Sequence, residues 1–286
     1  MKQPLFSILI ANYNNGKYLM DAIESVRQQT FSNWEIVLVD DASTDKSEEL
    51  YVALEKDERI HIYRNEQNMG CGYTKRRCAE LAKGELCGFL DPDDVLLPNA
   101  VEDSVANLRS HPKCALSFSR FYTCDENLNR TGECRLLELK GKSYFENRDY
   151  CPEHFVAFRK NAYDKTDGID ATLKAGVDQD LYFRLEEVGE ALVLNKFTYL
   201  YRQNTSALTS KPYWCYYWNT IVRHNTCLRR GLPDKDFAYA DYLQIVTENE
   251  RYAREQVEKM QQSKAYRLGK AILKPFSWLR RVKCKV

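Results

Sequence analysis

The sequence has no long apolar run, and this absence excludes whole classes of protein. No uninterrupted apolar stretch comes near the ~18 residues that a transmembrane helix needs. The stretch Phe6–Ala11 is too short for the core of a signal peptide, and it leads directly into polar residues. We therefore expect a protein that is made and kept in the cytoplasm.

Paired cysteines, glycine-rich loops and clustered histidines are missing as well. The 10 cysteines include no CxxC pair and several lie in apolar runs, so we expect reduced thiols. No GxGxxG motif or other glycine-rich phosphate loop follows the first apolar run, which argues against a dehydrogenase or a nucleotidyltransferase. The 4 histidines are scattered, and we expect His154 to be structural, with a position facing the acceptor as the alternative. A net charge of +1 argues against nucleic acid as a partner.

The sequence does contain the alternation of strands and helices that is typical of an α/β fold. Its hydrophobic residues, 44% of the total, are enough for a core. Short connections predict a mainly parallel, Rossmann-like sheet flanked by helices. The predicted strands are 6–11, 34–40, 59–65, 86–91, 114–122, 154–160, 191–195 and 197–202, the last two as separate strands or a hairpin. The predicted helices are 18–28, one starting after 45, 73–83, 178–188 and 235–262.

Polar clusters follow three of these strands. They are Asn12–Asn15, the pair Asp40 and Asp41, and Asp91–Asp94. Ligands of parallel sheets bind at the carboxyl ends of the strands, which share one edge. We therefore expect the three clusters to form one binding site.

The segment "FLDPDDVLLP" carries the clearest chemistry. Clustered carboxylates raise one another's pKa unless a cation neutralises them, and Mg²⁺ or Mn²⁺ held between carboxylates and substrate phosphates is a natural partner. The alternative is that Asp91–Asp94 only form a turn and cap the helix after Pro98. In "VLVDDASTD", Asp41 is a candidate acceptor for the N–H of a uracil ring, and the alternative is a helix cap supplied by Ser43 or Asp45.

Together, "SILIANYNNGKYL", "VLVDDASTD", "NMG…KRR…LAKGELCGFLDPDD" and "GVDQDLYFRL" resemble the motifs of family 2 glycosyltransferases of the bacterial cell-surface polysaccharide type, which have the GT-A fold. The resemblance covers roughly residues 5–205. It implies a catalytic domain over 1–205, with a nucleotide-binding half (1–110) and an acceptor half (111–205). Residues 206–286 are expected to form a helical extension.

The resemblance also implies roles for the residues of the donor site. Ala11 and Tyr13 fall where the family contacts and stacks on the nucleotide base, and Asp41 falls where it binds the uracil edge. Lys75 takes the place of a frequent arginine near the diphosphate. Asp91 and Asp93 match the DxD signature, in which Asp93 is the expected ligand of Mn²⁺ or Mg²⁺.

For the acceptor side, the resemblance implies that Asp178 is the general base. The family usually has a Glu-Asp pair here, but this chain has Val177 before Asp178, and Asp180 is a possible substitute base. The family often ends the region with Tyr-Arg-x-His, and Asn204 replaces that histidine. The alternative to an active enzyme is therefore an inactive partner subunit that binds nucleotide-sugar at the membrane.

The expected mechanism has a metal that neutralises the leaving diphosphate and a base on the opposite face of the sugar. This arrangement predicts in-line displacement, which inverts the configuration of the anomeric carbon. We expect a hexosyltransferase-like enzyme that uses a UDP-sugar and a glycan or lipid-linked acceptor. The absence of membrane helices argues against a processive synthase that threads its polymer across the bilayer.

The last 24 residues, 263–286, hold eight Lys or Arg and no acidic residue. Apolar residues recur in this segment at helical spacing, and Phe276 and Trp278 lie among them. A basic amphipathic helix with exposed aromatic residues is typical of the surface of an anionic membrane. We therefore expect a peripheral protein at the inner face of the plasma membrane, with a solubilising tail or a packed helix as the alternatives. A separate aromatic cluster at Trp214–Trp218 is expected in the core, with an acceptor groove as the alternative.

Overall fold

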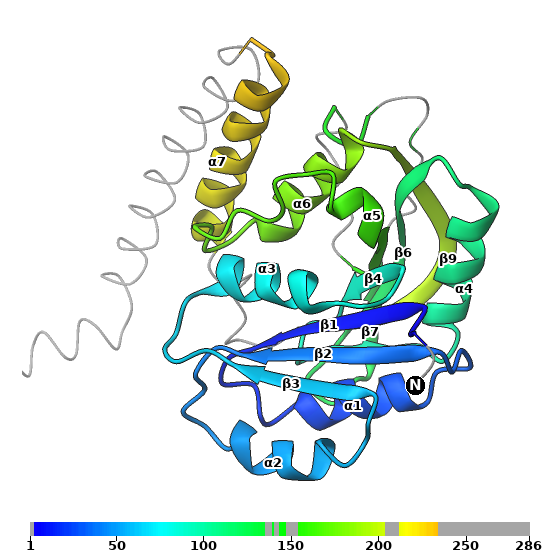
Figure 1. Ribbon diagram of the computed structural model, residues 1–286, viewed down its shortest axis with the longest axis vertical. Helices are drawn as coiled ribbons and strands as arrows, with labels where there is room; N and C mark the ends of the chain where they lie inside the picture. The colour runs from blue at the N-terminus through cyan, green and yellow to red at the C-terminus, as the bar shows by residue number, and fades with distance from the viewer. Residues whose placement is uncertain (1–2, 135–138, 140–142, 147–153, 204–211, 234–286) are drawn as a thin grey trace, which may run out of the picture.

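The computed structural model describes residues 3–134, 139, 143–146, 154–203 and 212–233 (Figure 1). The strands are β1 (Phe6–Asn12), β2 (Trp34–Asp40), β3 (Ile60–Arg64), β4 (Leu86–Phe89), β5 (Val95–Leu96), β6 (Cys114–Cys124), β7 (Arg130–Glu133), β8 (Val156–Arg159) and β9 (Glu190–Arg202). The helices are α1 (Leu19–Arg27), α2 (Ser47–Leu54), α3 (Cys71–Leu81), α4 (Ala100–Ser110), α5 (Lys160–Tyr163), α6 (Val177–Glu186) and α7 (Pro212–Arg230).

Within these residues, nine strands form one sheet in the order β3-β2-β1-β4-β8-β6-β9-β5, with β7 paired to β6. The first four strands in space are parallel, as predicted. The second half is mixed, because β8 runs antiparallel to both β4 and β6, whereas β9 runs parallel to β6. The α/β class is confirmed, and parallel pairing dominates only the N-terminal half.

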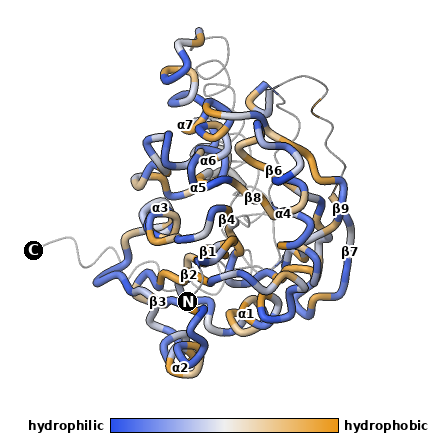
Figure 2. Tube along the Cα trace, turned by 45° about the vertical axis from the view of Figure 1, so that its right-hand side comes forward, coloured by the Kyte–Doolittle hydropathy of each residue, from blue (hydrophilic) through white to orange (hydrophobic). Residues whose placement is uncertain are grey.

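Both faces of the central strands are buried, which explains their continuous apolar runs. Along β1, Leu9 faces a core built with α3, α5, α6 and α7, while Ile8 and Ile10 face a second core built with α1, α2 and α4. Figure 1 shows α3 and α6 on one side of the strands and α1 and α2 on the other. Hydrophilic and hydrophobic residues alternate along α2 and α3 (Figure 2), as expected for helices with one face on the sheet.

The segments 191–195 and 197–202 form one continuous strand, β9, and not two strands or a hairpin. Its pairing with β6 shifts register at the polar residues Asn195 and Lys196, because Ser119 pairs with Leu194 and Arg120 pairs with Phe197. Two extra residues are thus accommodated as a bulge within one continuous strand.

The aromatic segment Trp214–Trp218 lies in α7. Trp218 packs against the core, whereas Tyr217 is 39% exposed, so the core interpretation holds for Trp218 and not for Tyr217. The predicted charged helix 235–262, the basic tail 263–286 and Asn204 lie outside the described residues. Among the described helices, none combines the length and the apolar character needed to cross a bilayer.

A close contact brings α3 against the loop that precedes α6. The backbone N–H of Gly72 donates to the Leu173 carbonyl at 3.0 Å. A Cβ at position 72 would lie 2.6 Å from that oxygen, so only glycine fits without movement of the backbone. This contact places the first turns of α3 and α6 side by side.

Candidate active site

The carboxyl ends of β1, β2 and β4 lie at one edge of the sheet. β1 and β2 pair Asn12 with Asp40, and β1 and β4 pair Leu9 with Phe89. The three polar clusters follow these positions directly. The prediction that they share one edge is therefore confirmed.

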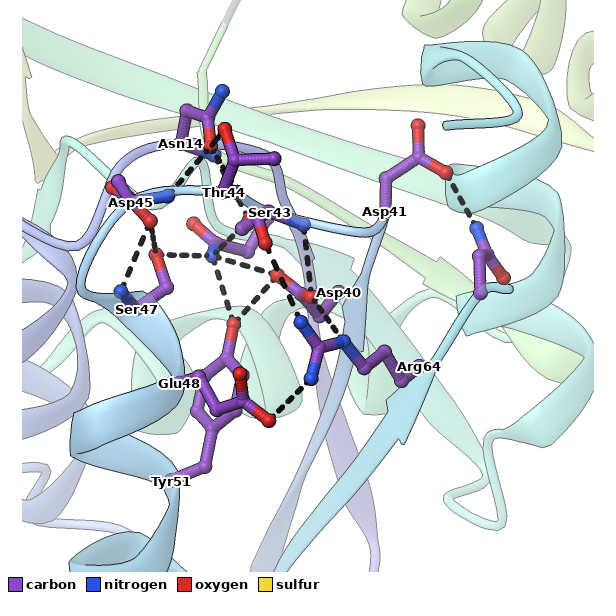
Figure 3. A network of polar contacts seen from close by, with 12 residues as sticks. Asn14, Asp40, Asp41, Ser43, Thr44, Asp45, Ser47, Glu48, Tyr51 and Arg64 are labelled. Carbon is purple, nitrogen blue, oxygen red and sulfur yellow. Dashed lines mark hydrogen bonds and ion pairs between the residues drawn. The ribbon is translucent and has the colours of Figure 1, made fainter. Parts of the chain in front are cut away.

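Asn14 joins the loops that follow β1 and β2 (Figure 3). It has a left-handed backbone, with φ of 56°, which asparagine tolerates better than most residues. Its Oδ1 accepts hydrogen bonds from the backbone N–H groups of Thr44 at 2.7 Å and Asp45 at 3.2 Å, and its own N–H donates to Ser43 Oγ at 2.9 Å. In return, Asp45 accepts from the N–H of Gly16 at 2.8 Å. These bonds fix the two loops relative to each other.

The predicted base-binding residues lie on these loops. Ala11 is partly buried, and Tyr13 is 45% exposed directly beside Asn14. An exposed tyrosine on an anchored loop can stack on a planar ligand at little cost in ordering. The roles of Ala11 and Tyr13 remain predictions.

The two aspartates after β2 have different surroundings. Asp40 is fully buried and accepts a hydrogen bond from the Tyr51 hydroxyl at 2.7 Å. Asp41 accepts from Asn65 Nδ2 at 2.6 Å and from the backbone N–H groups of Met69 and Gly70, both at 2.8 Å. Asp41 therefore holds the loop that leads into α3, and its predicted contact with a uracil edge would be an additional role.

Lys75 joins two predicted site carboxylates that are distant in sequence. Its Nζ lies 3.1 Å from Asp91 Oδ1 and 2.8 Å from Asp178 Oδ1, and its side chain is only 8% exposed. Burial disfavours the charged ammonium, but the charges of Asp178 and Asp91 outweigh it and raise the pKa of Lys75 well above its usual value. For Asp91, burial is likewise outweighed by Lys75, so the pKa of this carboxyl is lowered. The trio forms a charged bridge across the site.

The two carboxylates of α6, Asp178 and Asp180, differ in how far they are exposed. Asp178 lies in the first turn, and its side chain is 38% exposed beside Lys75. Asp180 is 1% exposed and accepts from Arg184 Nε at 2.8 Å and from the N–H of Asp170 at 3.1 Å. Val177 is 2% exposed in the core. The structure thus leaves Asp178, and not Asp180, available to a substrate.

The DPDD segment forms a turn, in which the N–H of Asp94 donates to the Asp91 carbonyl at 3.1 Å. Asp94 is 1% exposed and accepts from the Tyr199 hydroxyl at 2.8 Å and from the N–H of Arg202 at 2.7 Å. Arg202 also donates from Nε to the carbonyl of Asp93 at 2.7 Å. The end of β9 therefore anchors the turn. α4 begins after Asn99 without a side-chain cap, so capping does not explain these carboxylates.

Three groups at this turn have the spacing of metal ligands. Asp91, Asp94 and His154 each offer one ligand atom, and these three atoms lie within 4.8 Å of one another. Burial lowers the pKa of His154 to about 4, although the charge of Asp91 opposes this, so the imidazole is neutral near pH 7 and can ligate a cation. Two carboxylates and a neutral imidazole fit a divalent cation. Asp93 is not part of this group, and its predicted role as a ligand remains a prediction.

The environment of Asp94 predicts a measurable pH dependence of stability. Burial, followed by the charges of Asp93 and Asp91, raises the pKa of Asp94 well above the ordinary value of an aspartate. Above about pH 4 the folded protein therefore holds a proton that the unfolded chain has lost, so this group makes folding less favourable as the pH rises. In EDTA, the melting temperature of Asp94→Asn minus that of the wild type should increase from pH 4 to pH 7.

Asp125→Asn is the matched control, because hydrogen bonds from Asn129 lower the pKa of Asp125. Its melting temperature relative to the wild type should fall over the same interval. A difference between Asp94→Asn and the wild type that does not change with pH would contradict the assignment.

Sequence reasoning missed Asp94, Tyr199 and His154 as parts of the site. Asp94 was visible only as a member of the DPDD cluster. His154 gave no local signal, because it lies far along the chain from the turn and reaches it only through the pairing of β8 with β4.

Comparison with known proteins identifies the family. A model of "Glycosyl transferase family 2" matches residues 7–167, which is more than half of the chain. The chain belongs to glycosyltransferase family 2. It is 31% identical over 209 residues to chondroitin synthase from Escherichia coli, a match that covers 71% of this chain and 30% of that protein. The chain thus matches less than a third of the length of that relative.

Solved structures confirm the GT-A fold predicted from the motifs. TarS 1–349 of S. aureus, in complex with UDP-GlcNAc, superposes with a TM-score of 0.66 at 18% identity, over 92% of this chain and 77% of that chain. The mannosyltransferase PcManGT from Pyrobaculum calidifontis, in complex with GDP-Man and Mn²⁺, gives 0.60 at 11% identity, over 95% and 84%.

Proposed function

We propose that this family 2 protein is an inverting glycosyltransferase. It transfers a sugar from a nucleoside-diphosphate donor to a hydroxyl group of a glycan or lipid-linked acceptor during the assembly of cell-surface polysaccharide. The observation that carries the proposal is the bridge from Asp91 through Lys75 to Asp178, which brings the DxD segment and the predicted base into one site.

The donor side is assigned to the edge formed by the ends of β1, β2 and β4. Tyr13 stacks on the base, and Asp41 faces its edge. A uridine nucleotide is the favoured donor because an aspartate can accept a hydrogen bond from the uracil N–H, and because the similar TarS structure is a complex with UDP-GlcNAc. Lys75 supplies positive charge beside the diphosphate.

Asp91 and Asp93 would hold a Mn²⁺ or Mg²⁺ ion at the DPDD turn. When bound, such an ion neutralises negative charge on a leaving diphosphate. The residues of the chain perform the remaining steps. Lys75 holds Asp178 in place, and the exposed carboxylate of Asp178 takes the proton of the acceptor hydroxyl. Attack from the face opposite the diphosphate inverts the anomeric centre.

The relative named chondroitin synthase supports a polysaccharide product. Attachment at the inner face of the plasma membrane rests on the basic sequence of residues 263–286 alone. Exposure of Asp178 beside Lys75 favours an active enzyme over a partner subunit without activity.

Calorimetric titration of UDP, GDP and CDP into the full chain, with and without Mn²⁺, tests the donor assignment. We expect UDP to bind in the presence of Mn²⁺ and to bind at least about tenfold more weakly to Asp93→Ala, because loss of a metal contact costs this much or more. Glu102→Ala removes an acidic residue of α4 and should leave nucleotide binding unchanged. If no nucleotide binds with metal present, the proposed function is wrong.

A further inference from the structure

We propose that His154 is a direct ligand of the cation at the DPDD turn, and that its imidazole makes this site prefer Mn²⁺ or Co²⁺ over Mg²⁺. The proposal deepens the proposed function, because it rests on a cation that serves the donor diphosphate.

The first support is the convergence of three ligand groups from separate parts of the chain. Asp91, Asp94 and His154 each offer one ligand atom, and the three atoms lie within 4.8 Å of one another. Three ligand atoms spaced evenly around an ion with bonds of about 2.1 Å are about 3.6 Å apart. A shift of less than about 1 Å, within reach of side-chain rotation, would therefore close the group around an ion.

The second support is the orientation of the imidazole. The ring stacks on Tyr201 at 4.5 Å between centroids, with an interplanar angle of 20°, and on Tyr199 at 4.9 Å and 7°. Phe121 meets it edge to face at 5.2 Å. Stacking occupies the face of the ring, and one ring nitrogen lies within 4.8 Å of a carboxylate oxygen of Asp91 and of Asp94. Aromatic contacts of this kind fix a ligand's rotamer before the ion arrives.

The third support is the state of the carboxylates. Asp94 already accepts from the Tyr199 hydroxyl at 2.8 Å and from the N–H of Arg202 at 2.7 Å. Once a cation displaces the proton of Asp94, each carboxylate oxygen has a second lone pair, so these bonds are compatible with metal binding. Hydrogen bonds of this kind orient ligating carboxylates. Tyr199 therefore supports two ligand groups at once, through its hydroxyl on Asp94 and its ring face on His154.

Metal preference follows from the ligand chemistry. Mg²⁺ prefers an octahedral shell of oxygens, whereas imidazole favours transition-metal ions, with affinity rising from Mn²⁺ to Co²⁺. Carboxylates alone, whether from Asp91, Asp93 or Asp94, would not distinguish these ions strongly. The imidazole of His154 therefore supplies the discrimination at this site.

Nitrogen hyperfine coupling in the electron-spin-echo spectrum of bound Mn²⁺ tests the proposal directly. The tag-free full chain is loaded with Mn²⁺ alone and with Mn²⁺ plus UDP. We expect a histidine nitrogen signal in the wild type and its loss in His154→Phe, which keeps an aromatic ring in the stack. His111→Phe changes an exposed histidine and should keep the signal.

Metal titrations of the same proteins test the preference. In His154→Phe, the affinity for Mn²⁺ and Co²⁺ should fall at least about tenfold. The affinity for Mg²⁺ should change by less than about twofold, because Mg²⁺ gains little from imidazole.

The wild-type spectrum needs no variant, so the test survives if His154→Phe does not fold. A wild-type site that binds Mn²⁺ without a histidine signal overturns the proposal, as does equal loss of Mg²⁺ and Mn²⁺ affinity in His154→Phe. If the wild-type protein binds UDP, the proposed function stands whether or not the histidine signal appears. Conversely, a histidine signal with Mn²⁺ alone, in a protein that binds no nucleotide, would support the metal site and reject the donor assignment.

Discussion

Asp178→Asn should reduce sugar transfer by about 10²–10⁴-fold, the usual contribution of general acid–base catalysis. The amide has nearly the shape of the carboxylate but cannot take the proton of the acceptor hydroxyl. Nucleotide binding should stay within about threefold of the wild type, because Lys75 keeps its second partner, Asp91, at 3.1 Å. The measurement is the release of UDP from UDP-sugars with a panel of glycan acceptors, beside calorimetry with UDP.

Asp167→Asn is the matched control for this variant. The Asp167 side chain is 91% exposed and lies before α6, so its loss should leave both transfer and binding unchanged. Wild-type transfer by Asp178→Asn would show that another group is the base. A loss of UDP affinity as large as the loss of transfer would instead place Asp178 in donor binding.

The N-terminal half of the fold was predictable because local pattern and global fold agree there. The apolar runs of β1 and β2 are buried on both faces, and each ends at a polar residue, Asn12 or Asp40, at the site edge. Strand positions, parallel pairing and the shared edge of the polar clusters follow from that pattern.

The second half was less predictable because long-range pairing overrides local signals. Asn195 and Lys196 interrupt an apolar run and resemble a turn, but pairing with β6 turns them into a bulge in β9. Val177 occupies a position where the family has an acid, and its burial in the core shows why no second carboxylate faces the site there.

The site was predictable where motifs are contiguous and unpredictable where the fold assembles it. Asp91 and Asp178 were found from their motifs, but their connection through Lys75 depends on the contact of α3 with the loop before α6. His154 has no motif of its own and is recognisable only when β8 places it at the turn. Pairwise contacts of this kind leave no trace in a single sequence.

Lys75→Met removes the centre of the charged bridge between Asp91 and Asp178 and should have a large effect on both sugar transfer and nucleotide binding. Without the ammonium, Asp91 and Asp178 face each other without a cation. A donor diphosphate bound as proposed would also lose the positive charge of Lys75. Transfer should fall at least about 10²-fold, and the affinity for UDP at least about tenfold, which corresponds to about 1.4 kcal/mol. Lys75→Arg keeps the charge and should retain most of the affinity, whereas Lys83→Met, an exposed change just beyond α3, should have no effect.

Stability separates the structural part of this effect from the functional part. Removing one member of a buried ion pair costs about 3–5 kcal/mol, and the cost here should be about 3 kcal/mol or less because Asp91 and Asp178 are 34% and 38% exposed. In urea denaturation, Lys75→Met combined with Asp178→Asn should be more stable than Lys75→Met alone, because the second change removes the charge left without a partner. If the double variant is instead less stable, Lys75 does not neutralise Asp178. If Lys75→Met binds UDP as tightly as the wild type, the ammonium is a structural bridge that does not contact the diphosphate.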